Sequence, residues 1–224
     1  MGRPRRVDVG GLVYHALNRA SGRATLFGGP ADYRQFERVL EEAVQRTSMR
    51  LLAYVVMPNH WHLVLWPERD GQLARFMTWL TLTHSQRWHA TRGSAGAGHL
   101  YQGRYKSFLV QADDHLLAVC RYVERNPRRA RLVRRAEAWR WSSLWRREHG
   151  HGLALLSDWP VARPDDWRDS VNRAESAAGL EALRAAAQRG RPFGSGAWLE
   201  EAVRRFDLGS TLRPRGRPAR NKGS

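Results

Sequence analysis

The pattern of apolar and polar positions divides the first 130 residues into predicted strands and helices. Four short apolar runs are typical of β-strands: 12–18, 49–57, 60–67 and 105–111. Three segments instead repeat apolar side chains every three or four positions, as helices do: 31–47, 72–90 and 113–126. Pro58 and Asn59 separate the two middle strands, which predicts a hairpin. The resulting order favours an α+β fold, with one antiparallel sheet and helices packed on one face.

The pattern weakens beyond residue 150. We expect one domain over residues 1–150 and an irregular linker over 151–179. Residues 180–208 read as a small helical module, which either binds DNA or packs as a helical hairpin on the first domain. The composition of residues 209–224 is basic and typical of a disordered tail.

Charge narrows the class of partner. Lysine and arginine number 38 against 21 acidic residues, a formal net charge of +17. Such an excess indicates a polyanionic partner, most often nucleic acid. The single cysteine, Cys120, excludes an intramolecular disulfide. No run approaches the roughly 18 apolar residues of a membrane span, so we expect a cytoplasmic protein with no membrane partner.

The stretch His60-Trp61-His62 is the first candidate for chemistry. Alternate residues of a strand point to the same face, so both histidines should project together while Trp61 faces the core. Two imidazoles on one face can share a metal ion. Taken alone, the pair is more typical of two polar residues at the start of an ordinary strand than of a ligand pair.

The predicted helix at 113–126 offers candidates for a nucleophile and for a third metal ligand. Tyr122 and Asn126 are four residues apart and should lie on one helical face. The Asn126 amide oxygen can bind a hard cation. The plainer interpretation is a half-buried tyrosine and a helix-ending asparagine. Tyr101 and Tyr105 compete for the nucleophile role, because they flank an arginine in a predicted loop.

Five blocks of sequence together resemble a known family. PNHWHLVLW is similar to the HUH motif, two histidines around a bulky residue, of single-tyrosine transposases. Four further blocks follow the REP-associated tyrosine transposase branch in order and spacing: YHALNRASGRATLF, GHLYQGRYKSFLV, RYVERNPRRARLV and WRWSS. The resemblance covers roughly residues 12–147. It implies a ferredoxin-like sheet that carries the histidines, with a nearby helix that presents the tyrosine.

The resemblance also implies a mechanism. Tyr122 is expected to attack a single-stranded DNA phosphodiester, forming a 5′-phosphotyrosine intermediate and releasing a 3′-hydroxyl. His60, His62 and Asn126 are expected to hold Mg²⁺ or Mn²⁺. The implied partner is single-stranded or hairpin DNA, bound by a monomer or a homodimer. A non-catalytic DNA-binding regulator on the same scaffold and an RNA-processing nuclease remain the alternatives.

Basic residues near this site are candidates for DNA binding. Arg104 and Lys106 flank Tyr105, a basic and aromatic mixture that suits single strands. Arg128 and Arg129 follow the predicted catalytic helix and could bind a hairpin backbone. Arg215 and Arg217 lie in an Arg-Gly-Arg-Pro string that resembles the minor-groove-binding core of an AT-hook. Each of these groups could also be an ordinary solvated surface.

Overall fold

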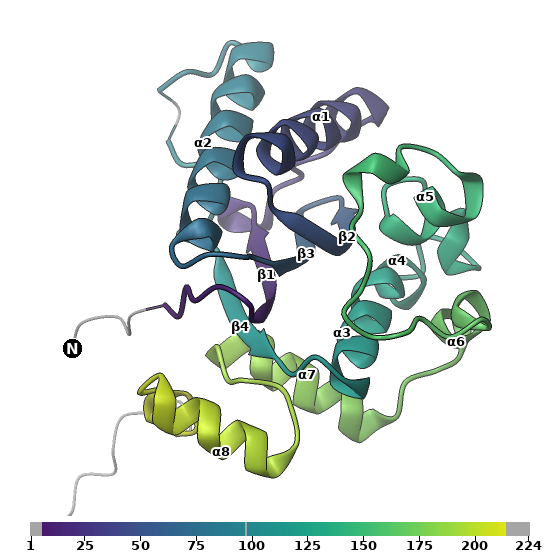
Figure 1. Cartoon of the computed structure of the whole chain (residues 1–224). Helices are drawn as coiled ribbons and strands as arrows, with labels where there is room; N and C mark the ends of the chain where they lie inside the picture. Colours follow the sequence, from purple (N-terminus) through teal and green to yellow (C-terminus); the bar gives the residue numbers. More distant parts are fainter. Residues whose placement is uncertain (1–5, 97, 214–224) are drawn as a thin grey trace, which may run out of the picture.

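The structure is a computed structural model that describes residues 6–96 and 98–213, built around a four-stranded antiparallel sheet (Figure 1). The strands are β1 (Val13–Arg19), β2 (Arg50–Met57), β3 (His60–Trp66) and β4 (Lys106–Val110). They lie in the order β2-β3-β1-β4, and every neighbouring pair is antiparallel. This order with its helical connections is ferredoxin-like. The predicted α+β class and antiparallel sheet are confirmed.

Helices α1 (Pro30–Thr47) and α2 (Gln72–Arg92) pack together over one face of the sheet (Figure 1). Pro30 begins α1, where its fixed φ suits the first turn and its missing N–H is not needed. The apolar stripe predicted along α1 is buried, with Phe36 and Leu40 inaccessible to solvent. These side chains share a core with Trp61 of β3.

The opposite face of the sheet is also covered, which corrects the expectation of helices on one face only. Its core includes residues of four helices: α3 (Asp114–Glu124), α5 (Ser143–His149), α6 (Trp167–Asn172) and α7 (Ala177–Arg189). The reason is visible in β2, where Arg50 alone is not fully buried. A strand with both faces buried carries an unbroken apolar run rather than an alternating one.

The helix expected over residues 113–126 is divided in two. Asp113 caps α3 as predicted, because its carboxylate accepts from the backbone N–H of His115 at 2.8 Å. Arg125 then separates α3 from the four-residue α4 (Asn126–Arg129). Pro127 lies in the first turn of α4, where proline is tolerated. The chain is therefore helical beyond Asn126, where the sequence predicted the end of the helix.

The irregular segment expected over residues 151–179 contains α6 and the start of α7, so that expectation was wrong in part. This segment is held in place by two tryptophans rather than by a periodic apolar stripe. Trp167 is buried, and the Trp159 ring lies 4.9 Å from the Trp167 ring between centroids. The Trp159 indole N–H also donates to the Leu52 carbonyl at 2.8 Å. Isolated anchors of this kind leave no helical pattern to detect.

The C-terminal region packs on the sheet. Helix α7 contacts β4 and α3, and α8 (Gly196–Arg205) follows it (Figure 1). Phe193 forms a parallel bridge with Val110 at the edge of β4. Both helices of residues 180–208 pack on the first domain, but in different cores: Leu183 of α7 lies in the core of the α3 face and Ala202 of α8 in that of the α1 and α2 face. The proposed domain boundaries themselves stay a prediction.

Segments that do not belong to the four strands cover both edges of the sheet. At the β2 edge, Ser142 bridges Val55 and the Val56 N–H donates to the Trp141 carbonyl at 2.9 Å. At the β4 edge, the Phe193 N–H donates to the Leu109 carbonyl at 2.8 Å. The remaining short elements are 3-10 helices: Ser21–Arg23, Ala136–Ala138, Leu153–Leu155 and Gly209–Thr211. Within the described residues, no helix is long and apolar enough to cross a membrane.

Candidate active site

The two histidines of β3 lie side by side on the sheet face that α3 covers. Their ring centroids are 5.0 Å apart, and the rings are nearly perpendicular at 83°. His62 is buried and His60 is partly buried. Trp61, between them, belongs to the core of the opposite face. The predicted projection of both histidines to one face is therefore confirmed.

In both rings the Nδ1 atom already has a partner. His60 Nδ1 lies 2.7 Å from Oδ1 of Asn59. A carboxamide oxygen only accepts hydrogen bonds, so His60 Nδ1 carries the proton and Nε2 has the lone pair. His62 Nδ1 lies 2.9 Å from Nε2 of His15, on the adjacent strand β1. These contacts leave Nε2 of each β3 histidine for a further ligand.

The surroundings keep both imidazoles neutral. Burial, together with the positive charges of Arg19 and Arg129, lowers the pKa of His60 to about 4. Burial also lowers the pKa of His62 well below its usual value, and the neighbouring His15 and His60 add to the effect. Neutral imidazole is the form that binds a metal ion. At neutral pH both side chains are in that form.

Helix α3 carries Tyr122 onto the same face. The Tyr122 and His62 ring centroids lie 5.8 Å apart, with the rings perpendicular at 88°. The guanidinium of Arg129 covers the Tyr122 ring, 4.2 Å from its centroid, and is held by Glu175 at 3.0 Å. Tyr122 is only 8% exposed. The phenol thus lies between a neutral imidazole and a fixed positive charge.

The two competing tyrosines lie elsewhere. Tyr101 belongs to the core of the α1 and α2 face, where its hydroxyl accepts from the Trp61 indole N–H at 3.0 Å. Tyr105 belongs to the same core and packs under the Arg6 guanidinium at 4.1 Å. Of the three candidates, Tyr122 is the one on the histidine face.

Asn126 begins α4, one helical turn beyond Tyr122, and is 7% exposed. Together with His60 and His62 it offers two imidazole nitrogens and one amide oxygen. This donor set fits a borderline cation such as Mn²⁺, and fits Mg²⁺ less well. In the described part of the chain, no group of three or more histidine, cysteine, aspartate or glutamate side chains could hold a metal. The predicted set contains only two residues of these types, His60 and His62, and its third member is the amide of Asn126.

Sequence reasoning missed two residues of this face. His15 contacts His62 directly, and Arg19 pairs in register with His60. Register partners of an antiparallel pair point to the same face, so Arg19 lies beside the histidines. A histidine inside the apolar run VYHAL was the available signal for His15, because a buried polar side chain requires a partner.

The predicted DNA-binding residues have different surroundings. Lys106 is exposed and pairs in register with Leu17, which pairs with His62 on its other side. Lys106 therefore lies on the histidine face, and the exposed Arg104 precedes it by two residues. Arg128 is partly buried and donates to the Arg134 carbonyl at 2.9 Å.

The remaining predicted DNA-binding residues either contact other side chains or lie outside the described residues. Arg129 is occupied by the Tyr122 ring and Glu175 rather than projecting freely. Arg215 and Arg217 lie outside the described residues.

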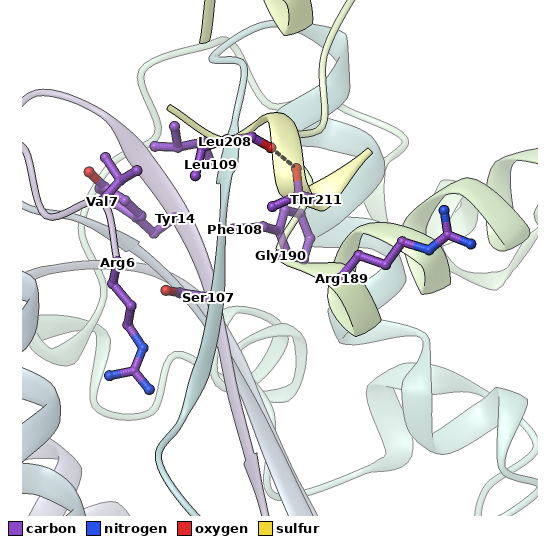
Figure 2. Close-up of a pocket in the computed structure, with 10 residues that line it drawn as sticks. All are labelled: Arg6, Val7, Tyr14, Ser107, Phe108, Leu109, Arg189, Gly190, Leu208 and Thr211. Atoms are coloured by element: carbon purple, nitrogen blue, oxygen red, sulfur yellow. Dashed lines mark hydrogen bonds between the residues drawn. The ribbon is translucent and has the colours of Figure 1, made fainter. Parts of the chain in front are cut away.

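A separate cavity of about 120 Å³ lies at the β4 edge, between the strand and the C-terminal segment (Figure 2). Tyr14, Leu109 and Leu208 contribute to its walls, and the Thr211 hydroxyl donates to the Leu208 carbonyl at 2.7 Å. Its lining includes none of the residues predicted for catalysis, metal binding or DNA binding.

Comparison with known proteins defines the class. The sequence profile of the family described as "Transposase IS200 like" matches residues 8–126, more than half of the chain. This chain belongs to the family of IS200-like transposases. Comparison with curated proteins gave no match.

Two solved structures are similar. One is described as a REP-associated tyrosine transposase bound to a REP hairpin. It is 17% identical with a TM-score of 0.56, and the match covers 74% of this chain and 96% of that one. The other is a putative transposase from Deinococcus radiodurans R1, 19% identical with a TM-score of 0.39, covering 55% and 95% of the two chains. The first likeness supports the fold described above.

Proposed function

We propose that this chain cleaves and rejoins single-stranded DNA at or near hairpin repeats, through a 5′-phosphotyrosine intermediate. The contact between the Tyr122 ring and His62, in a chain of the IS200-like transposase family, carries the proposal. The REP-associated protein of similar fold is described as bound to a REP hairpin, which supports hairpin DNA as the partner. We assign the chain to that branch on the same grounds.

The proposed reaction exchanges one phosphodiester for another. The Tyr122 hydroxyl oxygen attacks the phosphorus and loses its proton as the O–P bond forms. The bond from phosphorus to the 3′ oxygen breaks, and that oxygen leaves as a 3′-hydroxyl after taking up a proton. This hydroxyl can reverse the step or be replaced by another, so rejoining needs no external energy source.

His60, His62 and Asn126 are proposed to hold Mg²⁺ or Mn²⁺. When bound, the cation stabilises negative charge on the phosphodiester oxygens in the transition state. The protein residues supply the rest. The burial that keeps the imidazoles neutral also excludes water from the tyrosine, and a water-excluded site strengthens electrostatic interactions.

Positive side chains around the histidine face are proposed to bind the DNA backbone. Arg19, Arg104 and Lys106 follow the β1 and β4 side of the site, and Arg128 follows the α4 side. Contacts of this type fix the register of a strand without reading its sequence. The Arg215 and Arg217 string is proposed as an additional minor-groove contact.

Trapping of a covalent adduct tests the function. The protein is incubated with labelled single-stranded repeats from the flanks of its own gene, with and without Mn²⁺, and resolved on a denaturing gel. We expect a Mn²⁺-dependent band of protein-linked DNA that Tyr122→Phe abolishes. Tyr105→Phe is the matched control, since Tyr105 lies in the opposite core and the band should persist.

Three results would contradict the proposal. An adduct that persists in Tyr122→Phe excludes this residue as the nucleophile. Tight hairpin binding by the wild-type protein without any adduct favours the non-catalytic regulator. Cutting of RNA without a protein adduct favours the nuclease alternative.

A further inference from the structure

His15 is a buried polar residue that the proposed chemistry does not yet use. It lies on β1 with no solvent exposure, in register with Val64 and Phe108. The Phe108 ring packs on it at 4.8 Å between centroids. A polar side chain in such apolar surroundings is stabilised by the partner it finds. Its partner is Nδ1 of His62, at 2.9 Å from His15 Nε2.

The hydrogen bond between these two neutral imidazoles contains one proton, which is bound either to His62 Nδ1 or to His15 Nε2. If His62 Nδ1 carries it, His62 donates to His15 and keeps a lone pair at Nε2. If His15 Nε2 carries it, His62 must hold its own proton at Nε2 and cannot bind a cation there. The tautomer of the His15–His62 pair therefore decides whether His62 can act as a ligand.

His60 provides an independent parallel. Its Nδ1 donates to Asn59 Oδ1 in the β2–β3 turn at 2.7 Å, which leaves the lone pair at Nε2. Two groups from different parts of the chain thus contact the same nitrogen, Nδ1, of the two histidines. Outer partners of this kind fix the tautomer and orientation of metal-binding histidines.

We propose that His15 is a positioning residue for the metal site, and this inference rests on the proposed function. In the metal-loaded protein His15 would accept the Nδ1 proton of His62, which leaves the Nε2 lone pair of His62 available to the cation. In the described part of the chain, His15 Nδ1 is buried and has no hydrogen-bond partner. Protonating that atom has an energetic cost, so the metal-free pair should favour the other tautomer, and the cation should shift it.

Metal binding by the DNA-free protein tests the proposal without relying on activity. Free Mn²⁺ is measured by electron paramagnetic resonance during titration of the full chain. His15→Phe removes the acceptor at similar volume, and we expect Mn²⁺ binding to weaken about 10- to 100-fold, as for other outer partners of metal ligands. His15→Gln restores an acceptor and should recover most of the affinity.

His84→Phe is the matched control. His84 is likewise fully buried, and one of its ring nitrogens has no partner among the described residues, but it lies in the core on the opposite face. Its substitution should leave Mn²⁺ affinity unchanged. His62→Ala removes the proposed ligand itself and defines the signal expected when the site is lost.

The outcomes separate this inference from the proposed function. Loss of binding in His62→Ala with wild-type binding in His15→Phe overturns the role of His15 alone. Equal Mn²⁺ binding by the wild-type protein and His62→Ala overturns the metal site and with it this inference. If His15→Phe does not fold, ¹⁵N spectra of the wild-type protein with Mg²⁺ decide instead. A proton at His62 Nε2 in the loaded protein contradicts the proposal, and a proton at Nδ1 supports it.

Discussion

At the scale of single residues, the fold holds several histidines in the neutral state. Burial lowers the pKa of His15 and of His84 to about 3, and that of His60 to about 4. Each of these side chains gains a proton more readily in the unfolded chain than in the folded one. Neutral histidine side chains are therefore buried on both faces of the sheet.

Acid sensitivity follows from the low pKa of His84. Between about pH 6.5 and pH 3 the unfolded state binds a proton that folded His84 does not, so stability is lost as the pH falls. The loss is about 1.4 kcal/mol per pH unit for one such group. His84→Gln, whose amide oxygen can accept from the Tyr101 hydroxyl, should therefore lose less stability between pH 7 and pH 5. Urea denaturation at the two pH values measures the difference.

His99→Gln provides the control for that experiment, because His99 is exposed. We expect its loss of stability over the same pH interval to match the wild-type protein. Equal losses in His84→Gln and the wild-type protein would show that folding does not lower the pKa of His84.

Residue-level prediction from sequence succeeded where local geometry determines the outcome. Strand alternation placed His60 and His62 on one face, and the capping preference of aspartate identified Asp113. The contacts of His15 and Arg129 depend on which strands and helices become neighbours. Sequence spacing carries no information about such pairings, so these contacts were not predicted.

At the scale of secondary-structure elements, Glu124 joins three helices near the candidate site. This last residue of α3 has no solvent exposure. Its carboxylate accepts from the Ser143 hydroxyl of α5 at 2.5 Å and from the Trp167 indole N–H of α6 at 2.7 Å. It also pairs with Arg147 of α5 at 3.1 Å. The orientation of α3, and hence of Tyr122, depends on this network.

Removing the Glu124 carboxylate should destabilise the protein strongly. Glu124→Ala leaves the Arg147 guanidinium, which is 10% exposed, without its counter-charge. Loss of one member of a buried pair costs about 3–5 kcal/mol. Urea denaturation monitored by tryptophan fluorescence measures the change in the free energy of unfolding.

Glu42→Ala is the comparison for that measurement. Glu42 pairs with Arg87 at 2.7 Å, but both side chains are about 40% exposed. Exposed pairs contribute about 0–1 kcal/mol. A similar loss in the two variants would contradict a special role for the Glu124 network.

The elements predicted correctly were those with strong local periodicity. All four strands and the helices α1, α2 and α3 were located within a few residues. The coverage of the second sheet face was missed, although the unbroken apolar run of β2 indicated it. Helix α6 was missed because its stability depends on distant contacts such as Trp167 with Glu124.

At the scale of the whole molecule, both edges of the sheet are occupied. Ser142 covers β2 and Phe193 covers β4 through backbone hydrogen bonds. An open edge strand is a template for pairing with another chain. In the described part of the chain, these contacts leave less free strand edge through which two copies could join their sheets.

The covered edges favour the monomer over the homodimer. We expect size-exclusion chromatography with light scattering to give a mass close to 25.7 kDa, the mass of one chain. The high positive charge adds repulsion between copies, and this repulsion weakens as salt is added. The measurement is therefore made at low and at high salt. A mass near twice that of one chain in both conditions would contradict the prediction.

The covering of β4 also has a consequence for synthesis. During synthesis, Val110 at the end of the last strand is made long before Phe193. The Leu109 carbonyl and the Gln111 N–H, which pair with Phe193 in the complete chain, lack this partner in the interval. A nascent chain at this stage exposes an edge that can pair with its neighbours on the same messenger RNA. The late segment ends this exposure once it has been made, so we expect a version shortened near residue 178 to keep the open edge and to accumulate as insoluble protein.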